Sequence, residues 1–300
     1  MRARWAGGII EGSLLGLARF LRLLPLSTIE WVGRRLGDLA YYALRRRRAV
    51  ARENLTLAFG HERSPEELEG LCRQAFQHLG MTSVEVLSSL FPSPTFPLSR
   101  IRVEGLDHLR FAMDRGQGAL LLTAHFGNWE LLAAAHVLSG YPLSVVARPM
   151  DSPILNRLVT RFREGSGFEI IGKRRAFAEV IDALHRQRMV AILLDQNVTR
   201  REGVFVPFFG RAASTSKGLA LLALRTEAPV VPIFIRREAD GGHRVFVEPE
   251  IPPPRTEDRN KDITAFTAAF ARCVEETIRR WPEQWFWVHR RWRTRPAHEV

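Results

Sequence analysis

The chain has 300 residues, 46% of them hydrophobic, and its 44 Lys and Arg against 32 Asp and Glu give a net charge of +12. This length can bury one large core or two modest ones. So basic a surface suits an anionic membrane, an acidic or phosphorylated partner, or nucleic acid. Cys72 and Cys273 stand far apart without CxxC or histidine clustering, which argues against a zinc site or disulfide framework and indicates a reducing compartment.

Residues 1–48 are expected to form a helical segment that associates with a membrane. The stretch 7–26 is largely apolar, but Glu11, Arg19 and Arg22 interrupt it. A spanning helix needs about twenty apolar residues with few charges, and this segment falls short of that. The pattern is typical of an interfacial helix whose arginines reach up to the headgroups.

A second helix is expected over residues 28–44, because Pro25 should end the first. It leads into the arginine run 45–48, which suits anionic headgroups on the cytoplasmic side. The alternative is an ordinary helical hairpin packed on the rest of the protein, with a solvated arginine run.

A helical region and a linker are expected over residues 49–98. Ser64 is a good N-cap, Pro65 suits the first helical position, and two glutamates follow in the first turn. The helix is expected to run to about residue 90. The Phe-Pro-Ser-Pro segment 91–94 is the clearest internal linker.

From residue 99 to residue 300 strands and helices alternate, which predicts an α/β core with a mixed, mostly parallel sheet flanked by helices. The expected strands cover 100–104, 118–124, 143–147, 168–171, 189–194, 228–236 and 244–248, the last at an edge. The expected helices cover 106–115, 153–164, 176–186, 215–226 and 262–281. The helix over 176–186 is expected to bury its apolar residues at helical spacing, Phe177, Val180, Ile181 and Leu184.

The most informative stretch is Leu120–Glu130, LLLTAHFGNWE, which predicts a buried strand, a tight turn and a helix capped by Asn128. Ligands of open α/β sheets bind beyond the carboxyl ends of strands, where His125 would be a positioned general base. Glu130 is expected to hold the imidazole tautomer, and amides of the turn to face an oxyanion. The alternative is a satisfied histidine beside an ordinary helix cap.

Two further strands are expected to end in charged residues at the same edge. Arg148 follows the strand over 143–147, and Asp195 follows the continuous apolar run 189–194. Charged groups that gather in a cleft are candidates for a functional site. The residues leave open whether Arg148 stabilises an oxyanion or binds a phosphate.

HFGNWE at 125–130 resembles the H-x4-D/E signature of glycerolipid-type acyltransferases. Glu130 stands where most members of that superfamily have Asp. This makes the motif more similar to that of the lipid A late acyltransferases, the lauroyl and myristoyl transferases of Gram-negative bacteria. The same family resembles this chain in DQ at 195–196, PFFG at 207–210 and the tail with HRRW at 289–292. The similarity covers about residues 5 to 296.

The resemblance implies the α/β acyltransferase fold, with His125 as general base and Glu130 and Asp195 as the other catalytic residues. The segment 200–215 is expected to be an exposed aromatic loop suited to an acyl chain, followed by a helix that starts at Ser214-Thr215. Substrate contacts are expected from Gly127, Asn128, Arg148, Gln196, Phe208, Phe209, Thr215 and Arg290.

The implied reaction transfers a fatty acyl group from acyl carrier protein to a hydroxyl of a lipid A precursor at the cytoplasmic face of the inner membrane. The expected partners are the acyl carrier protein, the glycolipid acceptor and an anionic membrane surface, with no cofactor, metal or nucleic acid. Another acceptor, such as a phosphatidylinositol mannoside, and a thioesterase are the alternatives. The Trp- and Arg-rich tail from Trp285 is either a nucleic-acid patch or a folded C-terminal strap.

Overall fold

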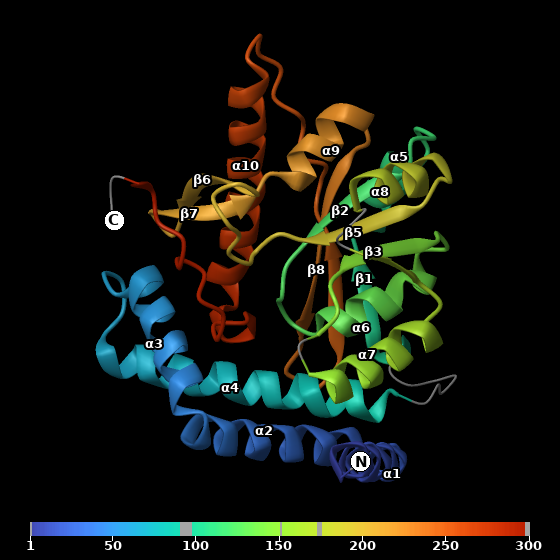
Figure 1. Cartoon of the computed structure of the whole chain (residues 1–300), viewed down its shortest axis with the longest axis vertical. Coiled ribbons are helices and arrows are strands. Elements are labelled where there is room, and N and C mark those ends of the chain that lie inside the picture. Colours follow the sequence, from blue (N-terminus) through green and yellow to red (C-terminus); the bar gives the residue numbers. More distant parts are fainter. Residues whose placement is uncertain (1, 91–97, 151, 173–175, 298–300) are drawn as a thin grey trace.

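The computed structural model describes residues 2–90, 98–150, 152–172 and 176–297. The linker expected at 91–94 lies outside the described residues. The described chain forms an N-terminal set of helices below a sheet that carries helices on both faces (Figure 1).

The N-terminal helices are α1 (Arg2–Leu21), α2 (Leu26–Ala43), α3 (Arg45–Phe59) and α4 (Pro65–Ser88). The break expected near Pro25 is present, since α1 ends at Leu21 and Pro25 is the N-cap residue of α2. Helix α4 starts in a capping box of Ser64 and Glu67, which confirms the predicted start. No helix among the described residues has the length and apolar character needed to cross a membrane.

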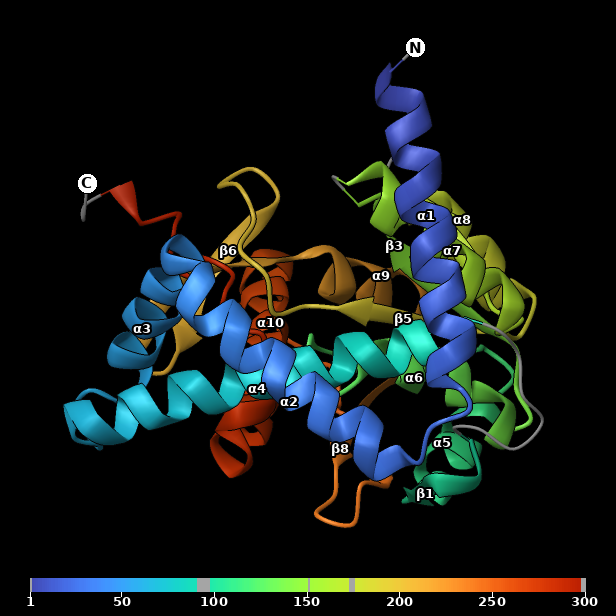
Figure 2. The same ribbon diagram turned by 90° about the horizontal axis from the view of Figure 1, so that it is seen from below.

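Helix α2 runs across α4, and Figure 2 shows the pair from below with α1 extending away from it. Glycines make this contact close: a Cβ at Gly37 would lie 2.4 Å from the Gln77 Cα, and one at Gly80 would lie 2.2 Å from the Gly33 carbonyl oxygen. Since no side chain fits there, α2 is held in one register on α4.

The sheet has seven strands in the order β1-β9-β8-β2-β5-β3-β4. Their bounds are β1 (Ile101–Glu104), β2 (Ala119–Thr123), β3 (Leu143–Ala147), β4 (Glu169–Gly172), β5 (Met189–Leu193), β8 (Val230–Arg237) and β9 (His243–Val247). Only the β8–β9 pair among these is antiparallel, so the predicted mixed, mostly parallel sheet is confirmed. The prediction that 244–248 is an edge strand is wrong, because β1 pairs with the outer side of β9.

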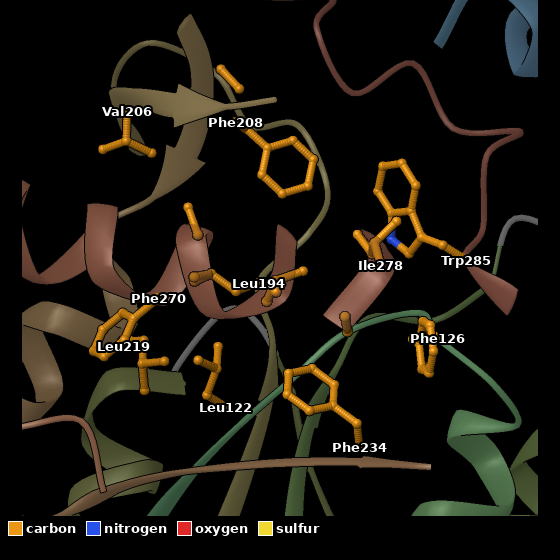
Figure 3. Packing of buried hydrophobic residues seen from close by; sticks show 14 of the residues in the cluster. Leu122, Phe126, Leu194, Val206, Phe208, Leu219, Phe234, Phe270, Ile278 and Trp285 are labelled. Carbon is orange, nitrogen blue, oxygen red and sulfur yellow. The ribbon is translucent and has the colours of Figure 1, made fainter. Parts of the chain in front are cut away.

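The flanking helices are α5 (Leu106–Met113), α6 (Trp129–Ala134), α7 (Pro153–Gly165), α8 (Ala176–His185), α9 (Gly218–Thr226) and α10 (Arg259–Arg280). Alternate residues of each strand serve different cores, since successive side chains point to opposite faces. In β2, Leu120 and Leu122 join the largest core, whereas Ala119 and Leu121 join a second core. Figure 3 shows part of the largest core, in which Trp285 lies near Ile278 and Phe126, and Phe270 lies near Leu219.

The expectation that Phe177 is buried is wrong, since 46% of its surface is exposed. Val180 and Leu184 are buried in the largest core and Ile181 packs against it. Phe177 belongs to the first turn of α8, at the end of the buried stripe, so helical spacing alone did not identify its surroundings.

The segment expected to be an exposed loop over 200–215 is a two-stranded antiparallel hairpin, β6 (Gly203–Phe208) and β7 (Arg211–Ser216). Phe209 and Gly210 form its turn with φ of 52° and 70°, as a type I′ turn requires. Phe208 and Phe209 are 1% and 5% exposed, and pack on Trp292. The expected exposed loop is therefore wrong, and the next helix begins at Gly218, after Thr215 has ended in β7.

The Trp- and Arg-rich tail is a folded strap that covers the largest core. Trp285 forms an isolated bridge with Phe126, and Trp287 is 1% exposed. The Arg291 guanidinium is equally buried and donates to the Ser214 carbonyl oxygen at 2.7 Å. The tail thus ties the hairpin to the turn that carries His125.

Candidate active site

Strands β2, β5 and β3 are neighbours and parallel, so their carboxyl ends lie at one edge of the sheet. His125 follows β2, Asp195 follows β5 and Arg148 follows β3. The predicted convergence of these three strand ends is confirmed.

Asp195 is the carboxylate that holds the His125 ring. Its Oδ1 lies 2.9 Å from His125 Nδ1, while its Oδ2 accepts from the His125 backbone N–H at 3.1 Å and from the Trp285 indole at 2.8 Å. Burial alone would raise the pKa of this carboxyl, but the His125 and Trp285 contacts hold it below its usual value. Because the carboxylate only accepts, the imidazole proton sits on Nδ1 and the Nε2 lone pair is left to act as a base.

Gln196 lies next to the Nε2 atom of His125. Its Nε2 is 3.3 Å from His125 Nε2, and since the imidazole nitrogen has no proton the amide donates to it. The Gln196 amide therefore occupies the place where a substrate hydroxyl would meet the base.

Glu130 does not hold the ring, contrary to expectation. Its two carboxylate oxygens accept from Arg163 of α7 at 3.0 and 2.6 Å. Glu130 lies in the first turn of α6, and its side chain reaches toward α7. Arg163 was not anticipated, because no local pattern separates it from the other arginines of that helix.

The turn amides are also not directed at an oxyanion. The N–H groups of His125, Phe126 and Gly127 donate to the Asp195 carboxylate, the Ala124 carbonyl and the Gln284 carbonyl. Gly127 has a φ of 59°, and a Cβ there would lie 1.8 Å from the Ile235 carbonyl oxygen. Glycine is therefore required by the close approach of the turn to β8, and its amide is already bound to the Gln284 carbonyl oxygen.

Asn128 lies buried beneath the turn. It is 1% exposed, its Oδ1 caps α6 by accepting from the Leu131 N–H, and its Nδ2 donates to Glu85 at 2.9 Å. Glu85 of α4 is also paired with the buried Arg237. Burial would raise the pKa of Glu85, but Arg237 holds it well below its usual value. Glu85 of α4 thus joins the N-terminal helices to β8 through a buried ion pair and to the His125 turn through its hydrogen bond with Asn128.

A cavity of about 1380 Å³ opens at the His125 edge of the sheet. His125, Glu130, Arg148, Arg163 and Gln196 line it. The rest of the wall is largely apolar and includes Leu121, Leu132, Val145, Phe168, Met189 and Ala191. An apolar chamber with a few convergent polar groups is the usual form of a ligand site.

The remaining expected substrate residues lie apart from the cavity lining formed by the described residues. Phe208 and Phe209 belong to the aromatic core, where the strap covers them. The Thr215 hydroxyl accepts from the buried Arg291, and Arg290 is exposed on the strap. These four expected contacts are not brought to His125.

Comparison with known proteins identifies the family that this chain resembles. The sequence profile described as "Bacterial lipid A biosynthesis acyltransferase" matches residues 11–294. The chain is 33% identical over 282 residues to the "Lipid A biosynthesis palmitoleoyltransferase" of Escherichia coli (strain K12), covering 92% of this chain and 88% of that protein. It is 32% identical over 290 residues to the "Lipid A biosynthesis lauroyltransferase" of the same strain, covering 94% and 90%.

A partial similarity reaches a different acceptor class. The chain is 32% identical over 198 residues to the "Phosphatidylinositol mannoside acyltransferase" of Mycolicibacterium smegmatis, which covers 64% of this chain and 62% of that protein. The full-length matches, together with the histidine at the strand end, settle the family. This chain is an acyltransferase and belongs to the bacterial lipid A biosynthesis acyltransferase family.

Proposed function

We propose that this acyltransferase moves a fatty acyl chain from acyl carrier protein to a hydroxyl of a lipid A precursor, with His125 as the general base. The observation that carries the proposal is the His125–Asp195 pair at the wall of a largely apolar cavity. The two Escherichia coli relatives, both named for lipid A biosynthesis, support the acceptor.

The reaction starts when the acceptor hydroxyl replaces the Gln196 amide at His125 Nε2. As the hydroxyl oxygen attacks the thioester carbonyl carbon, its proton moves to Nε2 and the carbonyl π electrons move to oxygen. Asp195 stabilises the imidazolium that forms. When the tetrahedral intermediate collapses, the carbon–sulfur bond breaks and the imidazolium returns the proton to the departing thiolate. The products are the acylated lipid and the free carrier thiol.

The apolar part of the cavity would hold the acyl chain. Its walls come from one face of β2, β5 and β3 and from α6, with Leu121, Val145 and Ala191 on successive strands. Each methylene removed from water contributes about 0.8 kcal/mol, so a chain that enters the cavity gains most of its affinity there.

An ion pair and a further arginine at the cavity have proposed roles beside the base. The Glu130–Arg163 pair joins α6 to α7 and keeps the two helices in place next to His125. Arg148 is exposed at the cavity rim, which suits contact with a phosphate of the acceptor better than contact with a buried oxyanion.

The N-terminal helices support a membrane location at the cytoplasmic face of the inner membrane. Phe20, Trp31 and Leu39 are 57%, 59% and 64% exposed, and each has an arginine within four residues in the sequence. Apolar residues flanked by arginines suit an anionic lipid surface. Leu36 and Leu44 of this region also line the cavity, which gives a lipid acceptor a direct route to His125.

The test is acyl transfer from acyl carrier protein to a tetra-acylated lipid A precursor in mixed micelles, followed by mass spectrometry. Wild type should form the ester, and His125→Ala should lose about 10²–10⁴-fold in rate while staying folded. His61→Ala, at an exposed histidine of the turn between α3 and α4, is the matched control and should keep the wild-type rate.

Other outcomes would contradict the proposal in different ways. Transfer that survives in His125→Ala would remove His125 as base. Free fatty acid as the only product would indicate a thioesterase. Ester formed only on a phosphatidylinositol mannoside would favour the acceptor class of the partial relatives.

A further inference from the structure

The tetrahedral intermediate needs hydrogen-bond donors for its oxyanion, and the catalytic turn does not supply them. The His125, Phe126 and Gly127 amides all donate to partners within the protein. Preorganised donors to the oxyanion supply much of the rate enhancement in acyl transfer. Such donors must therefore come from other groups that line the cavity near His125.

His289 of the strap is such a group. It lines the same cavity as His125 and Gln196. The backbone N–H of Asn197, the residue after Gln196, donates to His289 Nε2 at 3.1 Å. The His289 carbonyl oxygen accepts from the buried Asn54 amide at 2.6 Å, so the backbone is fixed as well as the ring.

The proton of the His289 ring is located by these contacts. Because Nε2 accepts from a backbone amide, the neutral ring carries its proton on Nδ1. Burial lowers the pKa of His289 to about 4, and the charges of Arg291 and Arg47 act in the same direction while Asp195 opposes them. The ring is therefore a neutral Nδ1–H donor at neutral pH.

We propose that His289 is a catalytic residue that donates its Nδ1–H to the thioester carbonyl oxygen, beside the Gln196 amide that the acceptor hydroxyl displaces from His125. As the carbonyl π electrons move to oxygen, this hydrogen bond strengthens and no proton leaves His289. A neutral imidazole suits the task, since it stabilises developing negative charge without protonating it. The inference rests on the proposed acyl transfer and adds the electrophilic side of the mechanism.

Two substitutions separate a donor from a structural ring. In His289→Gln the amide reaches the region of Nε2 and its oxygen still accepts from the Asn197 N–H, but the donor at Nδ1 is lost. In His289→Asn the amide nitrogen takes the region of Nδ1, so the donor is kept and the Asn197 contact is lost. A purely structural role predicts that Gln is the better substitute, whereas the proposed role predicts that Asn is.

The experiment measures kcat, KM and the thermal midpoint of wild type and both variants in the acyl carrier protein assay. His289→Gln should lose about 10²–10³-fold in kcat, with KM and midpoint close to wild type. His289→Asn should regain at least about tenfold of that kcat, in spite of a lower midpoint.

The inference is overturned if His289→Gln keeps the wild-type kcat, if both variants lose kcat equally, or if only KM changes. Those results leave the proposed function intact, because wild type still transfers the acyl group. Absence of transfer by wild type overturns the proposed function, and this inference with it.

Discussion

The two faces of the sheet are made from the same strands but differ in what lies against them. On one, the filled face, Leu120, Leu122 and Phe234 meet an aromatic core covered by α10 and the strap (Figure 3). On the other, the cavity face, Leu121 and Ala191 border an open chamber of about 1380 Å³.

The difference follows from the period of two along a strand and from side-chain size. Phenylalanines and tryptophans are concentrated in the core on one face, whereas the core on the other face consists mainly of aliphatic and small residues and leaves room for the cavity. We therefore propose that alternate residues of one strand serve stability and substrate binding. Asp195 joins the two, because its carboxylate contacts His125 toward the cavity and Trp285 from the filled face.

The largest expected effect on kcat comes from a change at Asp195, which contacts residues of both faces. Asp195→Asn should lower kcat by about 10³–10⁴-fold, as in catalytic triads, because the amide neither fixes the correct tautomer nor stabilises the imidazolium. Steady-state transfer, with circular dichroism to verify folding, measures the change. A folded variant within tenfold of wild type would separate Asp195 from catalysis.

The two faces can be compared directly in β2. Leu122→Ala on the filled face should cost about 2–5 kcal/mol in the free energy of unfolding, since it opens a void in a closed core. Leu121→Ala should cost less than about 2 kcal/mol, because that side chain already borders open space. Urea denaturation measures both. Equal costs would mean that the cavity face is as closely filled as its opposite.

Trp285 tests whether the filled face contributes to catalysis. Trp285→Phe keeps an aromatic ring but leaves the Asp195 Oδ2 without one donor. We expect it to lower the free energy of unfolding by about 1–3 kcal/mol and kcat by about tenfold. The matched control is Trp281→Phe, on a ring that packs on Phe126 and under Arg236, which should leave kcat unchanged. A similar kcat in both variants would contradict the role of the indole.

Acid should destabilise the contact between α4 and the sheet. Burial lowers the pKa of His78 from 6.5 to about 3, so below pH 6.5 the unfolded chain binds a proton that the folded chain does not. The contribution of neutral His78 to stability is therefore complete above pH 6.5 and is lost as the pH falls toward about 3, with about 2 kcal/mol gone at pH 5.

Denaturant titrations at pH 7 and pH 5 measure this loss. His78→Gln should show a smaller difference between the two pH values than wild type. An unchanged difference would mean that His78 is not the group that titrates.

The sequence predicted the strands of the sheet well because buried parallel strands are continuous apolar runs, and it predicted that His125, Arg148 and Asp195 meet because parallel strands end at one edge. The resemblance named Asp195 as a further catalytic residue, but Glu130 was expected to hold the His125 ring, and the Glu130–Arg163 pair was not predicted. Glu130 is 33 residues from Arg163, and His125 is 70 residues from Asp195, so each pairing depends on the complete fold. The turn amides were misjudged for the same reason, since the Gly127 amide is taken by the distant Gln284.

The hairpin over 203–216 was missed for a local reason. Its turn uses Phe209 at positive φ, where Asn, Asp or Gly would have been recognised. The aromatic side chains that indicated an acyl-binding loop are instead held in the core by the strap. Where no helix or strand pattern is recognised, hydrophobic residues alone therefore do not tell whether a segment binds a ligand or is buried in the core.

The most direct test of the two-face account is to locate the acyl chain. Acyl carrier protein loaded with a fatty acid that carries a terminal diazirine would be bound, irradiated and digested, and the labelled peptides identified by mass spectrometry. The account predicts labelling of residues on the cavity face, with Leu143, Met189 and Phe168 among them, and loss of labelling when unmodified acyl carrier protein competes. Labelling confined to α10, the hairpin or the strap would contradict it, since the acyl chain would then lie on the filled face.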